Sequence, residues 1–227
     1  MLAALTETYA AVTATVSALT DAEWTQATRC EGWCVGDVLY HLLLDPRRTL
    51  VAFASPTAQA ATTDLVEYWR RYRPGREGAA RHAEYVRRAA AAYPDHLHLV
   101  EEWEETSAAA LRAAAAAIAS GADESGGVNA RVRTQGLVIA VPDLLATLTV
   151  EAALHLLDLT VHLPHPHPVP PTALDTVRLT LNGLLGTPLP RGWDPLTGAL
   201  KGTGRAPLDA GDGAQLGPLA DRFPLLA

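Results

Sequence analysis

One segment in the second half of the chain, residues 142–163, most constrains how the chain can fold. Its sequence is PDLLATLTVEAALHLLDLTVHL, in which leucine, valine, alanine and threonine fill most positions and neither Lys nor Arg occurs. Its length, its apolar content and Pro142, which suits a first helical turn because no N–H needs a partner there, predict a long helix. A helix of this kind favours an all-α fold over a sheet-based one.

Apolar residues at helical spacing predict further helices on both sides of this segment. The predicted helices cover residues 2–20, 35–53, 62–92 with a break at 73–78, 95–120 and 172–185. Pro46 is expected to end or kink the helix at 35–53, because it lacks an N–H and clashes with the preceding turn, although helix should continue to about Phe53. Residues 121–127 are predicted to be a loop, and residues 128–141 either extended chain or an irregular connection. Several long helices joined by modest loops predict a helical bundle.

A proline-dense stretch, PHPHPVPP at residues 164–171, is predicted to be a stiff connector, because this much proline excludes regular helix and strand. The chain of 227 residues is long enough for one sizeable domain with a small appendage. We therefore expect a metal-binding helical bundle over residues 1–165, and over residues 166–227 the connector followed by a small extension packed on the bundle.

The composition argues against several classes of protein. The net charge is −7 and charged residues make up 19% of the chain, so there is no broad cationic surface for nucleic acid or anionic lipid. The first residues lack the basic region of a secretory signal, and no uncharged apolar run reaches the roughly 18 residues that a membrane helix needs. With only two cysteines, these features predict a cytoplasmic protein that keeps its thiols reduced.

Within the helix predicted at residues 142–163, five polar residues lie on one stripe. They follow one another at steps of four, four, three and four, and are Thr147, Glu151, His155, Asp158 and His162. A solvent-exposed face is one interpretation. Such a face usually mixes charges of both signs, whereas this stripe has carboxylates and imidazoles without a Lys or Arg, so a cation site is the other interpretation. Glu151 and His155 are one turn apart, roughly 6 Å along the axis, and can reach the same ion.

A third ligand has to come from another helix, and His41 is the best candidate because it lies within an apolar predicted helix. A lone histidine there can also be an ordinary core residue. His98 and Glu102 share the same spacing of four, but they stand among other glutamates, as is typical of a solvated face. His165 and His167 lie in the proline connector, which would hold a metal poorly.

The two cysteines, Cys30 and Cys34, flank a Gly-Trp turn that precedes the helix at 35–53. Cys34 occupies the N-cap position of that helix, and the seven residues that separate it from His41 correspond to about 10 Å, too far to share an ion. We interpret both cysteines as small apolar residues at a turn. A redox pair is the alternative, although its spacing lacks the usual two-residue gap.

Two elements of the sequence resemble a known family. TRCEGWCVGDVLYHL is similar to the Cys-Pro-Gly-Trp-Thr/Ser-x-x-Asp-x-x-x-His-Leu element of DinB-like proteins related to mycothiol-dependent maleylpyruvate isomerase. VEAALHLLDL resembles the second element of that family, Glu-x3-His-x2-Asp. Glu31 stands where the family has proline, and Cys34 where it has Thr or Ser. The resemblance covers most of the chain, and the tail after residue 201 is similar to the ends of many actinobacterial members.

The resemblance implies a DinB-like antiparallel four-helix bundle with a short, mostly helical C-terminal extension. It also implies that His41, Glu151 and His155 bind a divalent metal, with mycothiol as a cosubstrate. Zinc is the expected ion, and a site with two histidines and a glutamate also accepts nickel, iron or cobalt. Two imidazoles and one carboxylate leave a coordination position open, which is the pattern of catalytic zinc sites.

The leading hypothesis from the sequence is a metal-dependent enzyme, monomeric or homodimeric. It would use a low-molecular-weight, mycothiol-like thiol for S-transfer to, or isomerisation of, a small electrophilic substrate. Asp158 is expected to orient a ligand or the thiol, and Arg205 to steady an anionic substrate, unless it is simply a surface arginine. Two other functions compete with this one: a metal-activated hydrolase, and a non-catalytic metal-containing bundle that binds a small molecule or a partner protein.

Overall fold

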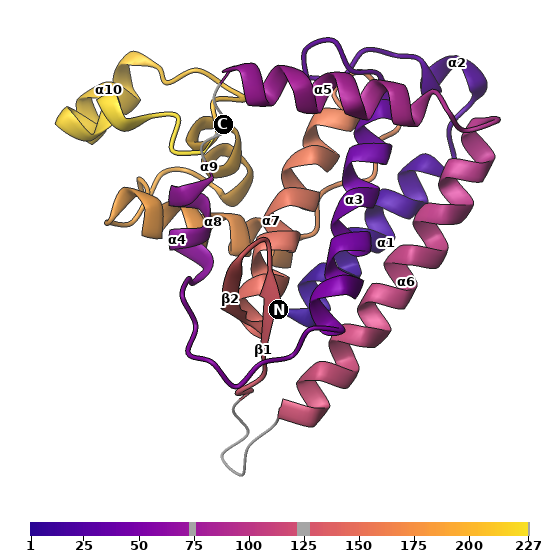
Figure 1. Cartoon of the computed structure of the whole chain (residues 1–227). Helices are drawn as coiled ribbons and strands as arrows, with labels where there is room; N and C mark the ends of the chain where they lie inside the picture. Colours follow the sequence, from indigo (N-terminus) through magenta and orange to yellow (C-terminus); the bar gives the residue numbers. More distant parts are fainter. Residues whose placement is uncertain (73–75, 122–127, 227) are drawn as a thin grey trace.

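The computed structural model describes residues 1–72, 76–121 and 128–226, and this part of the chain is mostly helical, as predicted (Figure 1). The elements in chain order are α1 (Leu2–Val16), α2 (Asp21–Trp24), α3 (Val35–Phe53), α4 (Leu65–Arg71), α5 (Arg76–Ala90), α6 (His96–Gly121), β1 (Arg131–Thr134), β2 (Leu137–Ala140), α7 (Val141–Leu159), α8 (Pro171–Leu185), α9 (Pro195–Gly202), α10 (Ala210–Leu216) and a 3₁₀ helix, η1 (Gly217–Arg222). Residues 73–75 of the predicted break and 122–127 of the predicted loop lie outside the described residues.

Four long helices, α1, α3, α6 and α7, form the bundle. In Figure 1, α1 and α7 run upward while α3 and α6 run downward, so the bundle contains two helices of each direction. The α3 and α6 helices pack against each other, as do α1 and α7. The prediction of an all-α bundle is confirmed.

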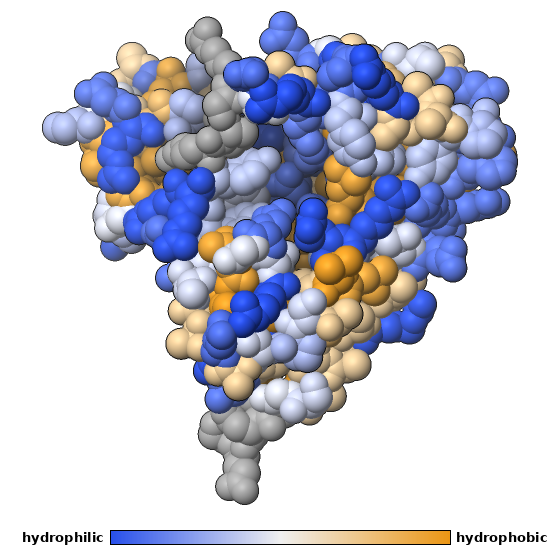
Figure 2. Space-filling view, in the orientation of Figure 1, coloured by the Kyte–Doolittle hydropathy of each residue, from blue (hydrophilic) through white to orange (hydrophobic). Residues whose placement is uncertain are grey.

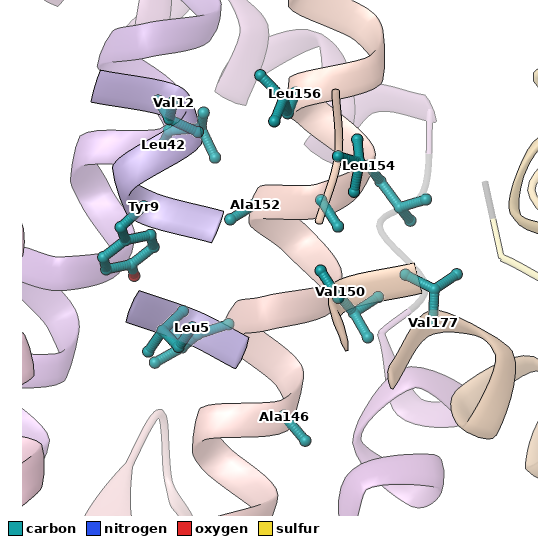
Figure 3. Close-up of a cluster of buried hydrophobic side chains, with 14 of the residues drawn as sticks. Leu5, Tyr9, Val12, Leu42, Ala146, Val150, Ala152, Leu154, Leu156 and Val177 are labelled. Carbon is teal, nitrogen blue, oxygen red and sulfur yellow. The ribbon is translucent and has the colours of Figure 1, made fainter. Parts of the chain in front are cut away.

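Helix α7 is the central element of the core, because residues on nearly every side of it are buried. Figure 3 shows apolar side chains of several helices gathered around it, among them Val12 of α1, Leu42 of α3 and Val177 of α8. Ala146 and Ala152 on α7 allow these neighbours to approach closely. Any polar side chain of α7 therefore lies in a setting where it needs a partner.

The predicted end of α3 near Phe53 is confirmed, whereas two other predicted helix ends were wrong: α1 ends at Val16 instead of residue 20, and α7 ends before Leu163. The α3 helix runs through Pro46, which is buried in the core, and ends at Phe53 as the apolar spacing predicted. Packing of α3 along its length outweighs the local cost of the proline. The α7 helix ends at Leu159 instead of Leu163, so His162 lies outside it. Pro164 disfavours helical geometry for the residue before it, which helps to end the helix early.

Residues 128–141, predicted as either extended or irregular, contain an antiparallel hairpin. Arg131 pairs with Ala140 and Thr134 with Leu137, which leaves a two-residue turn at Gln135 and Gly136. Both turn residues have positive φ, 49° and 78°, as the two-residue turns that suit twisted strands require. The hairpin leads directly into α7 and fixes where that helix begins.

The remaining helices cover the bundle. The α5 helix packs on α3, and its Val86 is fully buried. The connector has no regular structure until α8 begins at Pro171, and α8 packs on α7, α1 and α4. The α9 helix packs in turn on α8. None of the helices described is both long enough and apolar enough to span a membrane.

Candidate metal centre

Helix α7 carries its polar stripe inside the molecule. Thr147 and Asp158 are buried, and the side chains of Glu151 and His155 are 22% and 15% exposed. Thr147 donates its hydroxyl to the carbonyl of Leu144 in the same helix, at 2.7 Å. The interpretation of this stripe as a solvent-exposed face is therefore wrong, and Glu151, His155 and Asp158 need partners from elsewhere in the fold.

His41 of α3 lies directly opposite Glu151 and His155. Its Nε2 atom is 3.1 Å from Oε1 of Glu151, and the same carboxylate oxygen is 3.4 Å from Nε2 of His155. The two imidazole rings have centroids 4.7 Å apart and stand nearly perpendicular, at 84°. Trp33, in the turn before α3, packs beside the His41 ring with centroids 5.1 Å apart. The structure thus brings His41 of α3 next to Glu151 and His155 of α7, although Glu151 lies 110 residues further along the chain.

Burial and hydrogen bonding shift the pKa values of Glu151, His41 and His155 in different directions. Burial raises the pKa of Glu151, but hydrogen bonds with His155 and His41 outweigh it, and the pKa ends well below its usual range. Burial lowers the pKa of His41. Burial also disfavours charge on His155, yet its hydrogen bonds with Asp158, Cys30 and Glu151 hold its pKa well above the usual range. Glu151 is therefore an ionised carboxylate held between two imidazoles.

The second ring nitrogen of His155 is held by a carboxylate. Nδ1 of His155 is 3.1 Å from Oδ2 of Asp158, the residue one turn further along α7. Arg205, in the extension, donates to both oxygens of Asp158, through Nε at 2.8 Å and Nη2 at 2.6 Å. Although burial raises the pKa of Asp158, these contacts lower it to about 2 overall. Asp158 is thus placed to orient His155, and Arg205 to orient Asp158.

The comparisons with known proteins support one assignment. The model of the mycothiol maleylpyruvate isomerase N-terminal domain family matches residues 5–160 of this chain. The chain belongs to this family. Neither the comparison with curated proteins nor the comparison with solved structures found a match. The family is DinB-like, metal-binding and associated with mycothiol.

The residues of this family member fit a divalent metal. The donor atoms of His41, Glu151 and His155 all lie within 4.8 Å of one another, and two imidazole nitrogens with one carboxylate oxygen suit zinc, nickel, iron or cobalt. Two of the donor pairs, at 3.1 and 3.4 Å, already have the spacing of neighbouring ligands around a tetrahedral ion, roughly 3.4 Å for bonds near 2.1 Å. A metal would replace hydrogen bonds that now link these same atoms.

Two cavities meet at these three side chains. The larger, of about 600 Å³, is lined by residues of α3, α4, α5 and α7 together with the hairpin turn, and includes His41 and Glu151. Figure 2 shows the molecule hollowed on this face, below α5 and between α3 and α4 in the view of Figure 1. The smaller, of about 380 Å³, includes His41, Glu151 and His155 with Cys30 and Arg205. Small molecules can therefore reach the site from two compartments.

Two residues at the site were missed by sequence reasoning. His82 of α5 places Nε2 3.1 Å from Nδ1 of His41, so it can orient His41 as Asp158 orients His155. No local pattern marks His82, which stands in a charged amphipathic helix. Cys30 places its Sγ 3.7 Å from Nδ1 of His155 and 3.6 Å from Asp158. In the sequence, the position of Cys30 beside the Gly-Trp turn was the only signal that could have placed it near the site.

The competing sequence candidates lie elsewhere. His98 pairs with Asp95 at 2.8 Å, while Glu102 binds Arg47 and accepts from the Tyr93 hydroxyl at 2.6 Å, so the two do not form a site. The side chains of three further histidines are exposed and lie outside the site: His162, His165 and His167. Cys34 caps α3 as predicted, with its N–H donating to the Asp37 carboxylate at 3.0 Å, and both cysteines are free thiols.

Proposed function

We propose that this chain is a divalent-metal-dependent enzyme that uses a low-molecular-weight thiol, mycothiol-like, for S-transfer to or isomerisation of a small electrophilic substrate. The observation that carries the proposal is the meeting of His41, Glu151 and His155 within 4.8 Å, at the junction of two cavities. Membership of a mycothiol-associated, metal-binding family supports the choice of a thiol over water as the nucleophile. We take zinc as the resident ion, because two imidazoles and a carboxylate with an open position form a common catalytic zinc site.

His41, Glu151 and His155 would hold the metal in this proposal. When bound, such an ion favours the thiolate form of a sulfur donor, which is the nucleophilic form. His82 and Asp158 fix the orientation of the two imidazoles through their second ring nitrogens, and Arg205 fixes Asp158.

The walls of the cavities supply the rest of the chemistry. The ring of Trp69 lines both cavities and Trp33 lines the smaller one, and these indoles limit the water around the reacting atoms. Arg205 also lines the smaller cavity, although its Nε and Nη2 are engaged with Asp158. Its predicted contact with an anionic substrate would therefore use the remaining nitrogen, and this role stays a prediction.

We further propose that residues 1–165 form the metal-binding unit and residues 166–227 an extension that completes it, since Arg205 reaches Asp158 from the extension. The activity would take place in the cytoplasm, where Cys30 and Cys34 stay reduced. The partners would be a small electrophile and the thiol, with the protein acting as a monomer or homodimer.

The test combines elemental analysis with thiol consumption. Zinc-loaded protein is assayed with mycothiol and a panel of electrophiles that includes an activated alkene, an epoxide and an aryl halide. We expect about one zinc per chain and loss of free thiol for at least one electrophile. The Glu151→Ala variant should lose both the zinc and the activity, because the carboxylate holds the centre of the donor set. The matched control is Glu105→Ala, an exposed glutamate of α6, which should behave as wild type.

Two results would contradict the proposal. Turnover of the panel that needs no added thiol would indicate a metal-activated hydrolase. Zinc binding without any turnover, together with a lower melting temperature for Glu151→Ala, would indicate a non-catalytic metal-containing bundle.

A further inference from the structure

The two cavities that meet at the donor set differ in chemistry. The smaller cavity has mostly apolar walls, which include Trp33, Trp69 and Leu154. The larger cavity carries many uncharged hydrogen-bonding groups, among them Tyr68, Tyr85, Gln135 and Thr147, together with a few charged side chains. A molecule that bridges the two compartments would therefore meet an apolar wall on one side and a polar wall on the other.

Asp45 is the most unusual residue of the larger cavity. It lies one turn after His41 on α3, so it faces the same side of that helix, and it lines the cavity together with His41 and Glu151. Among the described residues, its carboxylate has no hydrogen-bond or ion-pair partner, although the residue is only partly exposed. Burial, followed by the nearby charge of Glu151, raises the pKa of Asp45 well above its usual range. A polar group left in this state gains most from a ligand that donates hydrogen bonds to it.

The charges of the larger cavity indicate which ligand would donate them. Arg47 is engaged by Glu102 and by the Tyr93 hydroxyl at 2.9 Å. Arg48 also lines the cavity; it is exposed and has no ion-pair partner among the described residues, so the wall carries one unpaired cation beside the carboxylate of Asp45. In the proposed enzyme the charge of Glu151 is taken up by the metal, so the wall offers one free carboxylate, Asp45, and one free guanidinium, Arg48, and favours a neutral ligand over an anion or a cation. Hydroxyl groups of a ligand can instead donate to Asp45 and exchange hydrogen bonds with neutral tyrosine, threonine and amide groups. The rings of Tyr68, Trp69 and Tyr72 offer apolar faces for the C–H surfaces of such a molecule.

We infer that the larger cavity binds the polyhydroxylated, sugar-like part of the thiol cosubstrate, with Asp45 accepting hydrogen bonds from its hydroxyl groups, and that the smaller, apolar cavity receives the electrophile. This inference rests on the proposed function, because it assigns the two partners of that reaction to the two compartments. The thiol sulfur would then lie at the donor set, where the compartments meet.

The experiment compares two thiols that share an N-acetylcysteine end. Mycothiol carries it on a sugar, and free N-acetylcysteine does not. Binding of each to the zinc-loaded full chain is measured by calorimetry for wild type, Asp45→Ala, Gln135→Gly and Ala83→Leu. Zinc content is measured for every protein. Gln135→Gly removes an amide of the larger cavity at a turn where φ is positive, so its fold is retained even if Asp45→Ala folds poorly. Ala83→Leu narrows the smaller cavity.

We expect Asp45→Ala to weaken mycothiol binding about three- to tenfold, as for loss of one hydrogen bond in a partly buried site, and Gln135→Gly to weaken it in the same direction. Binding of N-acetylcysteine should stay within about twofold of wild type in both variants, and Ala83→Leu should bind mycothiol normally. Three results would overturn the assignment of the compartments while leaving a thiol-dependent enzyme in place. The first is unchanged mycothiol binding in both Asp45→Ala and Gln135→Gly, and the second is that these variants weaken the binding of both thiols equally. The third is that only Ala83→Leu weakens mycothiol binding. Failure of zinc-loaded wild type to bind mycothiol at all would overturn the proposed function, and the inference with it.

Discussion

His82 connects the helix that covers the site to one of the proposed metal ligands. It packs near Trp33 with ring centroids 6.3 Å apart and reaches His41 through a contact of 3.1 Å. The second ring nitrogen of a metal-bound histidine is usually held by a hydrogen-bond partner, which fixes the tautomer and the ring orientation. For His155 that partner is Asp158, and for His41 it is the imidazole of His82.

Replacing His82 should therefore weaken metal binding without removing a ligand. We expect His82→Ala to lower zinc affinity about tenfold or more, which is the usual effect of losing such a partner. His82→Gln, whose amide can still hydrogen-bond to His41, should recover part of the loss. Competition with a chromophoric chelator measures the affinities. The control is His98→Ala, an exposed histidine of α6. Equal affinities for His82→Ala and His98→Ala would show that His82 does not position His41.

A second residue, Asp212, links stability to pH in the extension. It pairs with Lys201 and accepts from Nε1 of Trp193 at 2.7 Å. The hydrogen bond with Lys201 is the main cause that lowers the pKa of Asp212 from 3.8 to about 2. Because the pKa is lower in the folded state than in the unfolded state, the carboxylate stabilises the fold fully above about pH 3.8, and this contribution disappears as the pH falls towards about 2.

We therefore expect Asp212→Asn to melt at a lower temperature than wild type at pH 6, with the difference shrinking between about pH 4 and pH 2. Thermal unfolding at pH 6, 4, 3 and 2 measures it, and Asp175→Asn, an exposed aspartate of α8, is the control. A gap between wild type and Asp212→Asn that is as wide at pH 2 as at pH 6 would exclude the ionised carboxylate as its source.

At the scale of elements, α4 is held in place by a glycine of α8. A Cβ atom added to Gly183 would lie 2.3 Å from Cγ2 of Val66, closer than van der Waals contact allows. The α4 helix carries Tyr68 and Trp69, which line the cavities, so this close approach of α4 and α8 shapes the site.

Gly183→Ala should destabilise the fold by about 1–3 kcal/mol, since overpacking outweighs the gain in helix propensity. The matched control is Gly213→Ala in α10, where a Cβ meets nothing within 4 Å and alanine should be neutral or slightly stabilising. Chemical denaturation of both variants measures the difference. If Gly183→Ala proves as stable as Gly213→Ala, then α4 can shift away from α8 without cost.

The elements of the bundle could be predicted because their signals are local. The beginning of α3 at Val35 and its end at Phe53 followed from a turn and from apolar spacing. Whether α3 continues through Pro46 could not be predicted from local signals, since the burial of this proline in the packed fold decides it. The hairpin was ambiguous because Gln135 and Gly136 form a weaker turn signal than Asn-Gly.

The same distinction, between signals local to a segment and contacts that depend on the packed fold, applies to the candidate site. Glu151 and His155 share one helix and one spacing, so their convergence was readable from the sequence. His82 and Asp45 depend on how α5 and α3 enclose a cavity, and no spacing along the chain encodes that. Arg205 reaches Asp158 across 47 residues, a contact that only the packed fold defines.

At the scale of the whole molecule, the candidate metal centre joins parts that are far apart in the chain. The proposed ligands lie on α3 and α7, His82 reaches His41 from the covering helix α5, and Arg205 reaches Asp158 from the extension. An ion bound by His41 and His155 would therefore tie the bundle together at the point where the cover and the extension meet it. Binding that needs the folded arrangement stabilises the whole fold.

Zinc should accordingly raise the melting temperature of the entire chain in one transition. At a free zinc concentration 100 times the dissociation constant, the gain is about 2.7 kcal/mol, which corresponds to roughly 5–10 °C for a chain of this size. A chelator should reverse the shift, and His41→Ala should melt at the same temperature with and without zinc. The double variant His165→Ala/His167→Ala should keep the full shift, because these exposed connector residues lie apart from the site. A shift that survives in His41→Ala and vanishes in the connector variant would relocate zinc binding from the bundle to the connector.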